Sequence, residues 1–123
     1  MSEEGQPTSS PPPEPGLASL EDFKKLTFRV GVVVEAADHP NADRLLVLKV
    51  DLGDGAARQV VAGIKGSYAA ADLLGKRVVV VANLKSATLR GVESQGMVLA
   101  ASDGASIVVL SLERPIPAGT PVR

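Results

Sequence analysis

The sequence predicts a single all-β domain whose strands close into a small barrel. Its 123 residues suit one domain. Short runs rich in valine, leucine and isoleucine recur along the chain, separated by turns that contain glycine, proline or aspartate. One stretch, residues 68–74, has the alanine and leucine content of a helix. We therefore expect the core to be built mainly from strands.

The first half of the domain is expected to form three strands. Residues 28–35 are mostly β-branched, and Gly31 within them suggests a bulge or a bend. A polar loop at residues 37–43 follows. Residues 45–51 alternate in a way that predicts one face in the core. A glycine-rich hairpin turn then leads to a returning strand at residues 58–62.

The second half begins with the helical segment at residues 68–74, which ends at Gly75. Residues 77–82 are apolar on both faces and predict a buried strand. Two further strands are expected at residues 97–101 and 107–110. The proline-rich end of the chain cannot form a helix, so we expect it to lie extended along a surface.

This order of elements predicts the OB-fold, a five-stranded Greek-key barrel with one short helix between strands 3 and 4. The C-terminal residues add a β extension. OB-folds bind oligonucleotides on the face of strands 2 and 3 and on the adjoining loops. The ordered domain is expected to span residues 19–123, after a disordered tail at residues 1–18 that is rich in proline, serine and glutamate.

Charge and aromatic content limit the ligands that such a barrel could take. Residues 19–123 hold 13 basic and 11 acidic side chains, a net charge of +2, so bulk charge alone cannot hold a nucleic acid. Aromatic residues make up 2% of the chain, which leaves almost none to stack on unpaired bases. If the protein binds RNA, we expect it to read the shape, backbone and 2′-hydroxyls of a folded molecule.

No motif in the sequence indicates catalysis, a metal or a cofactor. His39 is the only histidine, and no cysteine could join it in a zinc site, so we expect a solvated or capping role for it. Ser94 has no histidine nearby in sequence to act as a base. The polar N-terminus and the absence of cysteine and of long apolar runs predict a cytoplasmic protein. A non-enzymatic binding module is expected.

Residues 83–101 have the composition of a binding loop. The segment exceeds the usual length of a connection and carries two cations among hydroxyl, amide and glycine residues. Two more cations lie near the second strand, where a solvated face paired with Asp43 and Asp51 is the alternative interpretation. The methionine of the loop could fill the core or form an apolar pad, and its residue type favours the core. The candidate polar contacts are Arg44, Lys49, Asn83, Lys85, Arg90, Ser94 and Gln95.

Four blocks of this sequence resemble one known family. They are FRVG at residues 28–31, HPNADRL at 39–45, ANLK at 82–85 and LRGVESQGMVLA at 89–100. The blocks resemble the OB-fold tRNA-binding domain found at the C-terminus of many bacterial methionyl-tRNA synthetases. The same domain occurs as free-standing proteins, sometimes described as a synthetase beta subunit, and in eukaryotic multi-synthetase accessory proteins. The resemblance covers about residues 22–123.

The resemblance implies a homodimer that binds the outer corner of tRNA by shape, with little sequence preference. Such a module would act as an appended or trans-acting part of methionyl-tRNA synthetase. It would place Met97 among the contact residues. Family members often carry lysine where this chain has Arg44, which changes the hydrogen-bond geometry. Dimerisation would involve residues from about 104 onward.

Two alternatives stay open. The first is an OB-fold protein-export chaperone, which would use an apolar groove on a dimer instead of a cationic face. The second is a dimerisation module that does not touch RNA. The blocks at residues 39–43 and 94–97 resemble the tRNA binders more than the chaperones. Salt-dependent RNA binding would separate the tRNA binder from the pure dimerisation module.

Overall fold

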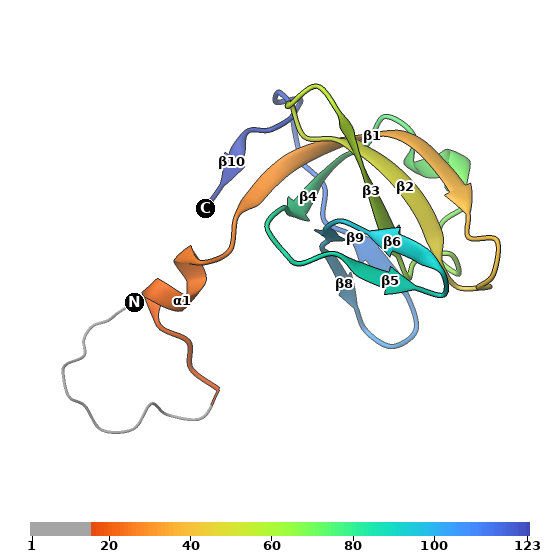
Figure 1. Cartoon of the computed structure of the whole chain (residues 1–123), viewed down its shortest axis with the longest axis horizontal. Helices are drawn as coiled ribbons and strands as arrows, with labels where there is room; N and C mark the ends of the chain where they lie inside the picture. Colours follow the sequence, from red (N-terminus) through yellow and green to blue (C-terminus); the bar gives the residue numbers. More distant parts are fainter. Residues whose placement is uncertain (1–15) are drawn as a thin grey trace.

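A strongly curved β-sheet wraps into a nearly closed barrel in the computed structural model, which describes residues 16–123 (Figure 1). The sheet has the strand order β3-β2-β1-β4-β7, and β10 pairs with β1 in addition. All of these neighbouring strands are antiparallel. The sheet is formed by β1 (Phe28–Asp38), β2 (Leu46–Asp51), β3 (Ala57–Ala62), β4 (Arg77–Val81), β7 (Met97–Val98) and β10 (Pro121–Val122).

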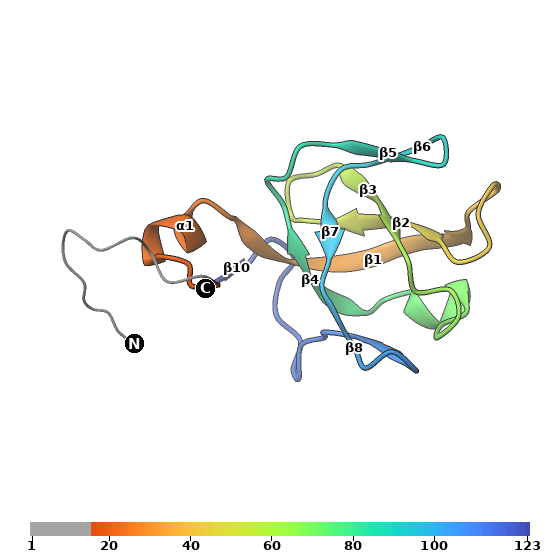
Figure 2. The same cartoon turned by 90° about the horizontal axis from the view of Figure 1, so that it is seen from below.

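Two hairpins and two short helices complete the described part of the chain. The helices are α1 (Leu20–Lys24) and the 3₁₀ helix η1 (Ala70–Leu73). The hairpins are β5 (Ala87–Leu89) with β6 (Val92–Ser94), and β8 (Ala100–Ser102) with β9 (Ile107–Val109). Figure 2 shows them on opposite sides of β1. Among residues 16–123, no helix has the length and apolar character needed to span a membrane.

The predicted all-β barrel of OB type is confirmed, with corrections to single elements. The helical segment is shorter than expected and is a 3₁₀ helix. The strand expected at residues 97–101 is split at Leu99 into β7 and β8, because β7 pairs with β4 whereas β8 pairs with β9. The loop expected at residues 83–101 contains the β5–β6 hairpin. Most of the predicted disordered tail, residues 1–15, lies outside the described residues.

Strand β1 organises the barrel, because it pairs with β4 along its first half and with β2 along its second half. The expected bulge at Gly31 was wrong: the register shift lies between Val33 and Glu35. Glycine occupies position 31 for a packing reason. A Cβ there would collide with Cγ1 of Val50 and lie 3.0 Å from Cγ2 of Val80. The missing side chain lets β1 approach the barrel interior.

The core is almost entirely aliphatic, and strand β2 contributes to it by strict alternation. Every second residue of β2 is buried, as its pattern predicted. Tyr68 packs against the cluster from the side and is partly buried. Its hydroxyl accepts a hydrogen bond from the backbone N–H of Val109 at 3.0 Å. The cluster consists of Val33, Leu46, Leu48, Val50, Leu52, Val60, Ala62, Ile64, Leu73, Val78, Val80 and Val109.

Hydrogen bonds between the end of β6 and the free edge of β3 close the barrel. The backbone N–H of Gln95 donates to the carbonyl of Gln59 at 2.7 Å. The N–H of Val61 donates to Oγ of Ser94 at 2.9 Å, and that hydroxyl donates to the carbonyl of Gly96 at 3.0 Å. The edge of β3 is therefore satisfied without a regular ladder to β7.

The C-terminal segment is extended, as expected, and packs on the barrel of its own chain. The carbonyl of Thr120 accepts a hydrogen bond from the N–H of Val30 at 2.9 Å, and Gly119 donates back to Val30 at 2.7 Å. Nε of Arg77 donates to the carbonyl of Ile116 at 2.9 Å. These contacts place β10 beside the first residues of β1.

Candidate nucleic-acid interface

The β5–β6 hairpin carries a cation at its tip through a tight turn. Leu89 and Val92 are the last paired residues, so the turn consists of Arg90 and Gly91. Both have positive φ values, +53° and +91°. Two left-handed residues in succession are typical of two-residue hairpin turns, where glycine and asparagine are usual and arginine is rare. The turn therefore holds Arg90 exposed at the end of a short, twisted ribbon.

His39 joins this hairpin to the loop between β1 and β2. Its Nε2 lies 2.9 Å from the carbonyl oxygen of Leu89, and its Nδ1 accepts a hydrogen bond of 2.9 Å from the N–H of Asn41. The side chain is 5% exposed, so of the two expected roles, solvated or capping, the solvated one was wrong. The turn lies beside the same loop, since a Cβ on Gly91 would be 3.9 Å from Nδ2 of Asn41.

Within residues 16–123, four of the predicted contact residues are cations without an ionic partner. The ion pairs found in that range involve Lys25, Arg58 and Lys65 instead. The alternative in which aspartates neutralise the strand-2 cations is therefore not realised there. An unpaired cation can bind a phosphate without first breaking an ion pair. The four unpaired candidate cations are Arg44, Lys49, Lys85 and Arg90.

The fold brings these cations onto neighbouring elements. Lys49 stands on the outer face of β2, opposite Gln59 of β3. Gln59 in turn donates from Nε2 to the carbonyl of Glu93 on β6 at 2.7 Å, which links this face to the hairpin. Arg44 lies on the loop that His39 ties to the hairpin. The face also carries carboxylates, since Glu35 is the cross-strand neighbour of Lys49.

Two of the predicted polar contacts are already engaged in fixing the fold. Oδ1 of Asn83 accepts from the N–H of Thr27 at 2.7 Å, and its Nδ2 donates to the carbonyl of Lys25 at 2.6 Å. Ser94 is 5% exposed and closes the barrel as described above. Their contribution to a binding surface would be to position other groups. Direct contact of these side chains with RNA stays a prediction.

Gln95 and Met97 lie at the surface next to the closing segment. Oε1 of Gln95 accepts from the N–H of Gln59 at 3.1 Å, while the residue remains exposed. Met97 is 50% exposed, so the core position that its residue type favoured was wrong. On β7 the alternation turns Val98 toward the barrel and Met97 away from it. Met97 is thus free to act as an apolar pad.

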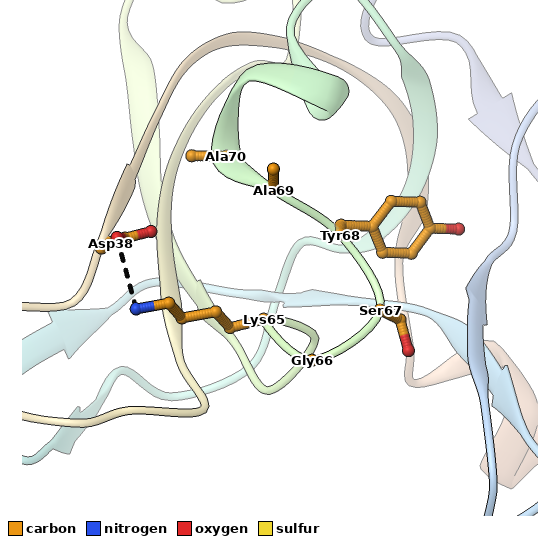
Figure 3. A pocket seen from close by; sticks show the side chains of 7 residues that line it. All are labelled: Asp38, Lys65, Gly66, Ser67, Tyr68, Ala69 and Ala70. Carbon is orange, nitrogen blue, oxygen red and sulfur yellow. Dashed lines mark ion pairs between the residues drawn. The ribbon is translucent and has the colours of Figure 1, made fainter.

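A separate pocket of about 570 Å³ lies at the loop before η1 (Figure 3). Its ion pair joins Lys65 to Asp38 at 3.3 Å. The hydroxyls of Ser67 and Tyr68 accept hydrogen bonds from backbone N–H groups of β9. These polar side chains are therefore each engaged with another part of the protein. Among the residues that the structure describes, no group of three or more His, Cys, Asp or Glu side chains is arranged to hold a metal ion.

A nearly closed antiparallel barrel with cations on β2 and on the loops next to it defines an OB-fold binding module. Residues 28–121 match the family model tRNA_bind, described as "Putative tRNA binding domain". The chain belongs to this tRNA-binding domain family and is related to methionyl-tRNA synthetases.

The relatives in sequence include archaeal methionine–tRNA ligases. The chain is 52% identical over 105 residues to "Methionine--tRNA ligase" of Thermococcus kodakarensis, which covers 85% of this chain. It is 46% identical over 110 residues to the ligase of the same name from Nanoarchaeum equitans, which covers 89% of this chain. In both cases the match covers 14% of the ligase. The chain thus spans a small part of the length of these relatives.

Solved structures with the same fold include proteins with different names. A MetRS-related protein from Pyrococcus horikoshii superposes with a TM-score of 0.81 at 31% identity, covering 87% of this chain and 98% of that one. The chaperone CsaA from Bacillus anthracis gives a TM-score of 0.80 at 30% identity, covering 88% and 100%. A protein related to MetRS and a protein named as a chaperone therefore share the overall shape of this chain.

Proposed function

We propose that residues 19–123 form a module that binds folded tRNA by contacting the phosphate backbone of the RNA. The observation that carries this proposal is the set of four cations, unpaired within residues 16–123, on adjoining elements. Two of them, Lys85 and Arg90, flank β5 of the hairpin. Arg44 lies on the loop that His39 joins to the hairpin, and Lys49 lies on β2 opposite Gln59 of β3, which donates to Glu93 of the hairpin.

Recognition by shape, largely independent of sequence, follows from the chemistry of this face. It offers guanidinium and ammonium groups, which suit phosphates, while the few aromatic residues of the chain leave little on which bases could stack. Met97 and the exposed Leu89 can contact ribose rings. Because several cations must meet phosphates at fixed spacings, a folded RNA is favoured over a flexible strand.

The module would serve methionyl-tRNA synthetase, either appended to it or acting in trans. The identity to archaeal methionine–tRNA ligases supports this role. Binding to the outer corner of tRNA would leave the acceptor end free for a catalytic unit. We further propose that the module is a homodimer, since a dimer doubles the phosphate contacts available to one or two tRNAs.

Affinity measured against salt concentration tests the proposal. Each phosphate contact should add about 0.7 to 0.9 to the negative slope of log affinity against log salt concentration. The chain should also prefer mixed tRNA to a single-stranded RNA of equal length. A flat salt response would overturn tRNA binding by this face. Equal affinity for both RNAs would overturn recognition by shape and indicate a generic cationic surface.

Substitution of the hairpin cations gives a sharper test. Lys85→Ala and Arg90→Ala should each weaken binding to every tRNA species about equally, by roughly 0.5–1.5 kcal/mol, and reduce the salt slope by about one contact. Both side chains are exposed, so the thermal midpoint should not change. Lys76→Ala is the matched control, because Lys76 lies at the end of β4 opposite to Lys85. This variant should bind tRNA with the affinity of the wild type. Unfolding of either hairpin variant would assign it a structural role instead.

The structural similarity to CsaA supports a chaperone as the second candidate function. A chaperone of this fold would hold unfolded chains on apolar surface, and exposed apolar side chains do occur on β9 and beyond it. Suppression of aggregation of a denatured test protein would then survive Arg90→Ala. If that variant loses tRNA binding and the chain has no effect on aggregation, the chaperone function is excluded.

A further inference from the structure

His39 is buried, and its two ring nitrogens make two different hydrogen bonds. Within residues 16–123, His39 and Ser94 are the polar side chains that are buried. Nδ1 of His39 accepts a hydrogen bond from the N–H of Asn41, so it carries no proton. The proton of the neutral ring is therefore on Nε2, which donates to the carbonyl of Leu89 at 2.9 Å. The ring thus joins the N–H of Asn41 to the carbonyl of Leu89.

The hydrogen bond to Leu89 holds the tip of the hairpin, whereas Glu93 and Ser94 at its base are bound by Gln59 and Val61 of β3. Between residues 85 and 92 it is the one hydrogen bond that reaches another element of the described chain. The whole of β5 is exposed, so little packing holds it in place. Leu89 directly precedes Arg90, and the loop of His39 also carries Arg44. The bond from His39 thus fixes the tip of the hairpin, which carries Arg90, next to the loop that carries Arg44.

We propose that His39 is a positioning residue for tRNA binding. This inference rests on the proposed function. By fixing the β5–β6 turn against the loop between β1 and β2, His39 presents Arg90 and Arg44 as one preformed surface. A preformed surface loses less conformational entropy on binding than a loose hairpin that must be ordered by the RNA. His39 touches no phosphate itself in this scheme and acts through the turn.

Two amide variants separate the two hydrogen bonds of His39. In His39→Asn, Oδ1 can occupy the place of Nδ1 and keep the bond from Asn41, but the side chain is too short to reach Leu89. In His39→Gln, the amide can reach the place of Nε2 and donate to Leu89. We expect the Asn variant to lose about five- to tenfold in tRNA affinity and the Gln variant to stay within about twofold of the wild type.

A double-mutant cycle with Arg90→Ala provides a readout that a purely structural role would not move. If His39 acts through the turn, the losses caused by His39→Asn and Arg90→Ala should be far from additive, because a displaced Arg90 no longer contributes. Additive losses would overturn the proposal. Equal losses in the Asn and Gln variants would overturn it too, since the ring itself would then matter rather than its bond to Leu89.

Amide hydrogen exchange tests this role of His39 without RNA. Protection of the paired amides of the β5–β6 hairpin should fall in His39→Asn and persist in His39→Gln, while β2 and β3 remain protected in both. Unchanged hairpin protection in the Asn variant would overturn the inference. If the wild type fails to bind tRNA, the proposed function fails. The exchange comparison then still decides whether His39 holds the hairpin.

Discussion

At position 31, β1 passes beside the fully buried side chains of Val50 and Val80. A backbone that comes so close to its own core leaves no room for even one carbon atom. The neighbouring Cδ2 of Leu52 would lie 3.1 Å from a Cβ at this site. Glycine is needed here for space.

Gly31→Ala should therefore destabilise the domain by about 1–3 kcal/mol, because overpacking forces valines with few rotamers to move. Urea unfolding measures the loss. Adding Val50→Ala to Gly31→Ala should recover part of the stability, although Val50→Ala alone creates a cavity. Gly66→Ala is the control: no atom lies within 4 Å of the place that its Cβ would take, so its effect should be neutral or slightly favourable. A fully stable Gly31→Ala variant would contradict the packing argument.

The residue types predicted that the cations are exposed, but they did not predict that His39 and Ser94 are buried and hydrogen-bonded. Arg44, Lys85 and Arg90 are exposed, as expected of charged side chains in polar loops. His39 was expected to be solvated or to act as a cap, yet it is buried and its partner Leu89 is 50 positions away in sequence. Ser94 likewise finds its partner in Val61, 33 positions away. Local sequence contains no information about such partners, because the closure of the barrel creates them.

At the scale of elements, the least predictable piece was the β5–β6 hairpin. Its strands have three residues each, too few to show an alternation. Its turn uses Arg-Gly, whereas Asn-Gly or Asp-Gly is the usual signal. The long strands β1 and β2 were predicted within a few residues, since their patterns extend far enough to be recognised.

The turn between β8 and β9 has a carboxylate that should make it sensitive to acid. Hydrogen bonds from the N–H groups of Ser106 and Ala105 to the carboxylate of Asp103, at 2.8 and 2.9 Å, lower its pKa below the ordinary value of 3.8. A lowered pKa in the folded state stabilises the turn at pH values above 3.8. This stabilisation is lost as the pH falls through the folded pKa.

Amide exchange or amide chemical shifts of Ala105 and Ser106 between about pH 5 and about pH 2 should thus report a loosening of this turn at the acid end. In Asp103→Asn, the side-chain oxygen still accepts hydrogen bonds but no longer titrates, so the local pH dependence should vanish. The same acid transition in the Asn variant would assign the effect to another group. The strands β1 to β4 should not respond to this titration.

At the scale of the whole molecule, the order of strands and helix was enough to predict the barrel. Three strands joined by short turns, followed by a short helix and a buried strand, can enclose one aliphatic core in only a few arrangements. The order did not predict how the barrel closes, because closure uses irregular hydrogen bonds around Ser94 and Gln95. The relation to tRNA-binding domains came from sequence blocks rather than from the pattern of strands.

If the chain forms the proposed dimer, we expect exposed apolar side chains at β9 to lie in the interface. Val108 and Leu110 are two positions apart, at β9 and just beyond it, and are 57% and 41% exposed. Val108→Asp combined with Leu110→Asp should convert a dimer to a folded monomer, measured by sedimentation equilibrium. Val34→Asp, at an exposed valine of β1, should leave the dimer intact. A doubly substituted chain that still dimerises would place the interface elsewhere.

Such point substitutions test the interface better than truncation does. Removing residues from about 112 onward would also remove the carbonyl that binds Arg77 and the strand that pairs with β1. The truncated chain would then lose stability for reasons unrelated to a second subunit. The substituted side chains are apolar and make no hydrogen bonds, so their replacement isolates the contact between subunits.

The pairing of β10 with β1 has a consequence for how the domain can be built into larger proteins. Phe28 and Val122 are direct cross-strand partners, so the ordered chain enters and leaves the barrel at the same point. Figures 1 and 2 show this point at the end away from the β5–β6 hairpin. A host protein could accept the barrel as an insertion within one surface loop, with both junctions adjacent and the cationic hairpin pointing outward.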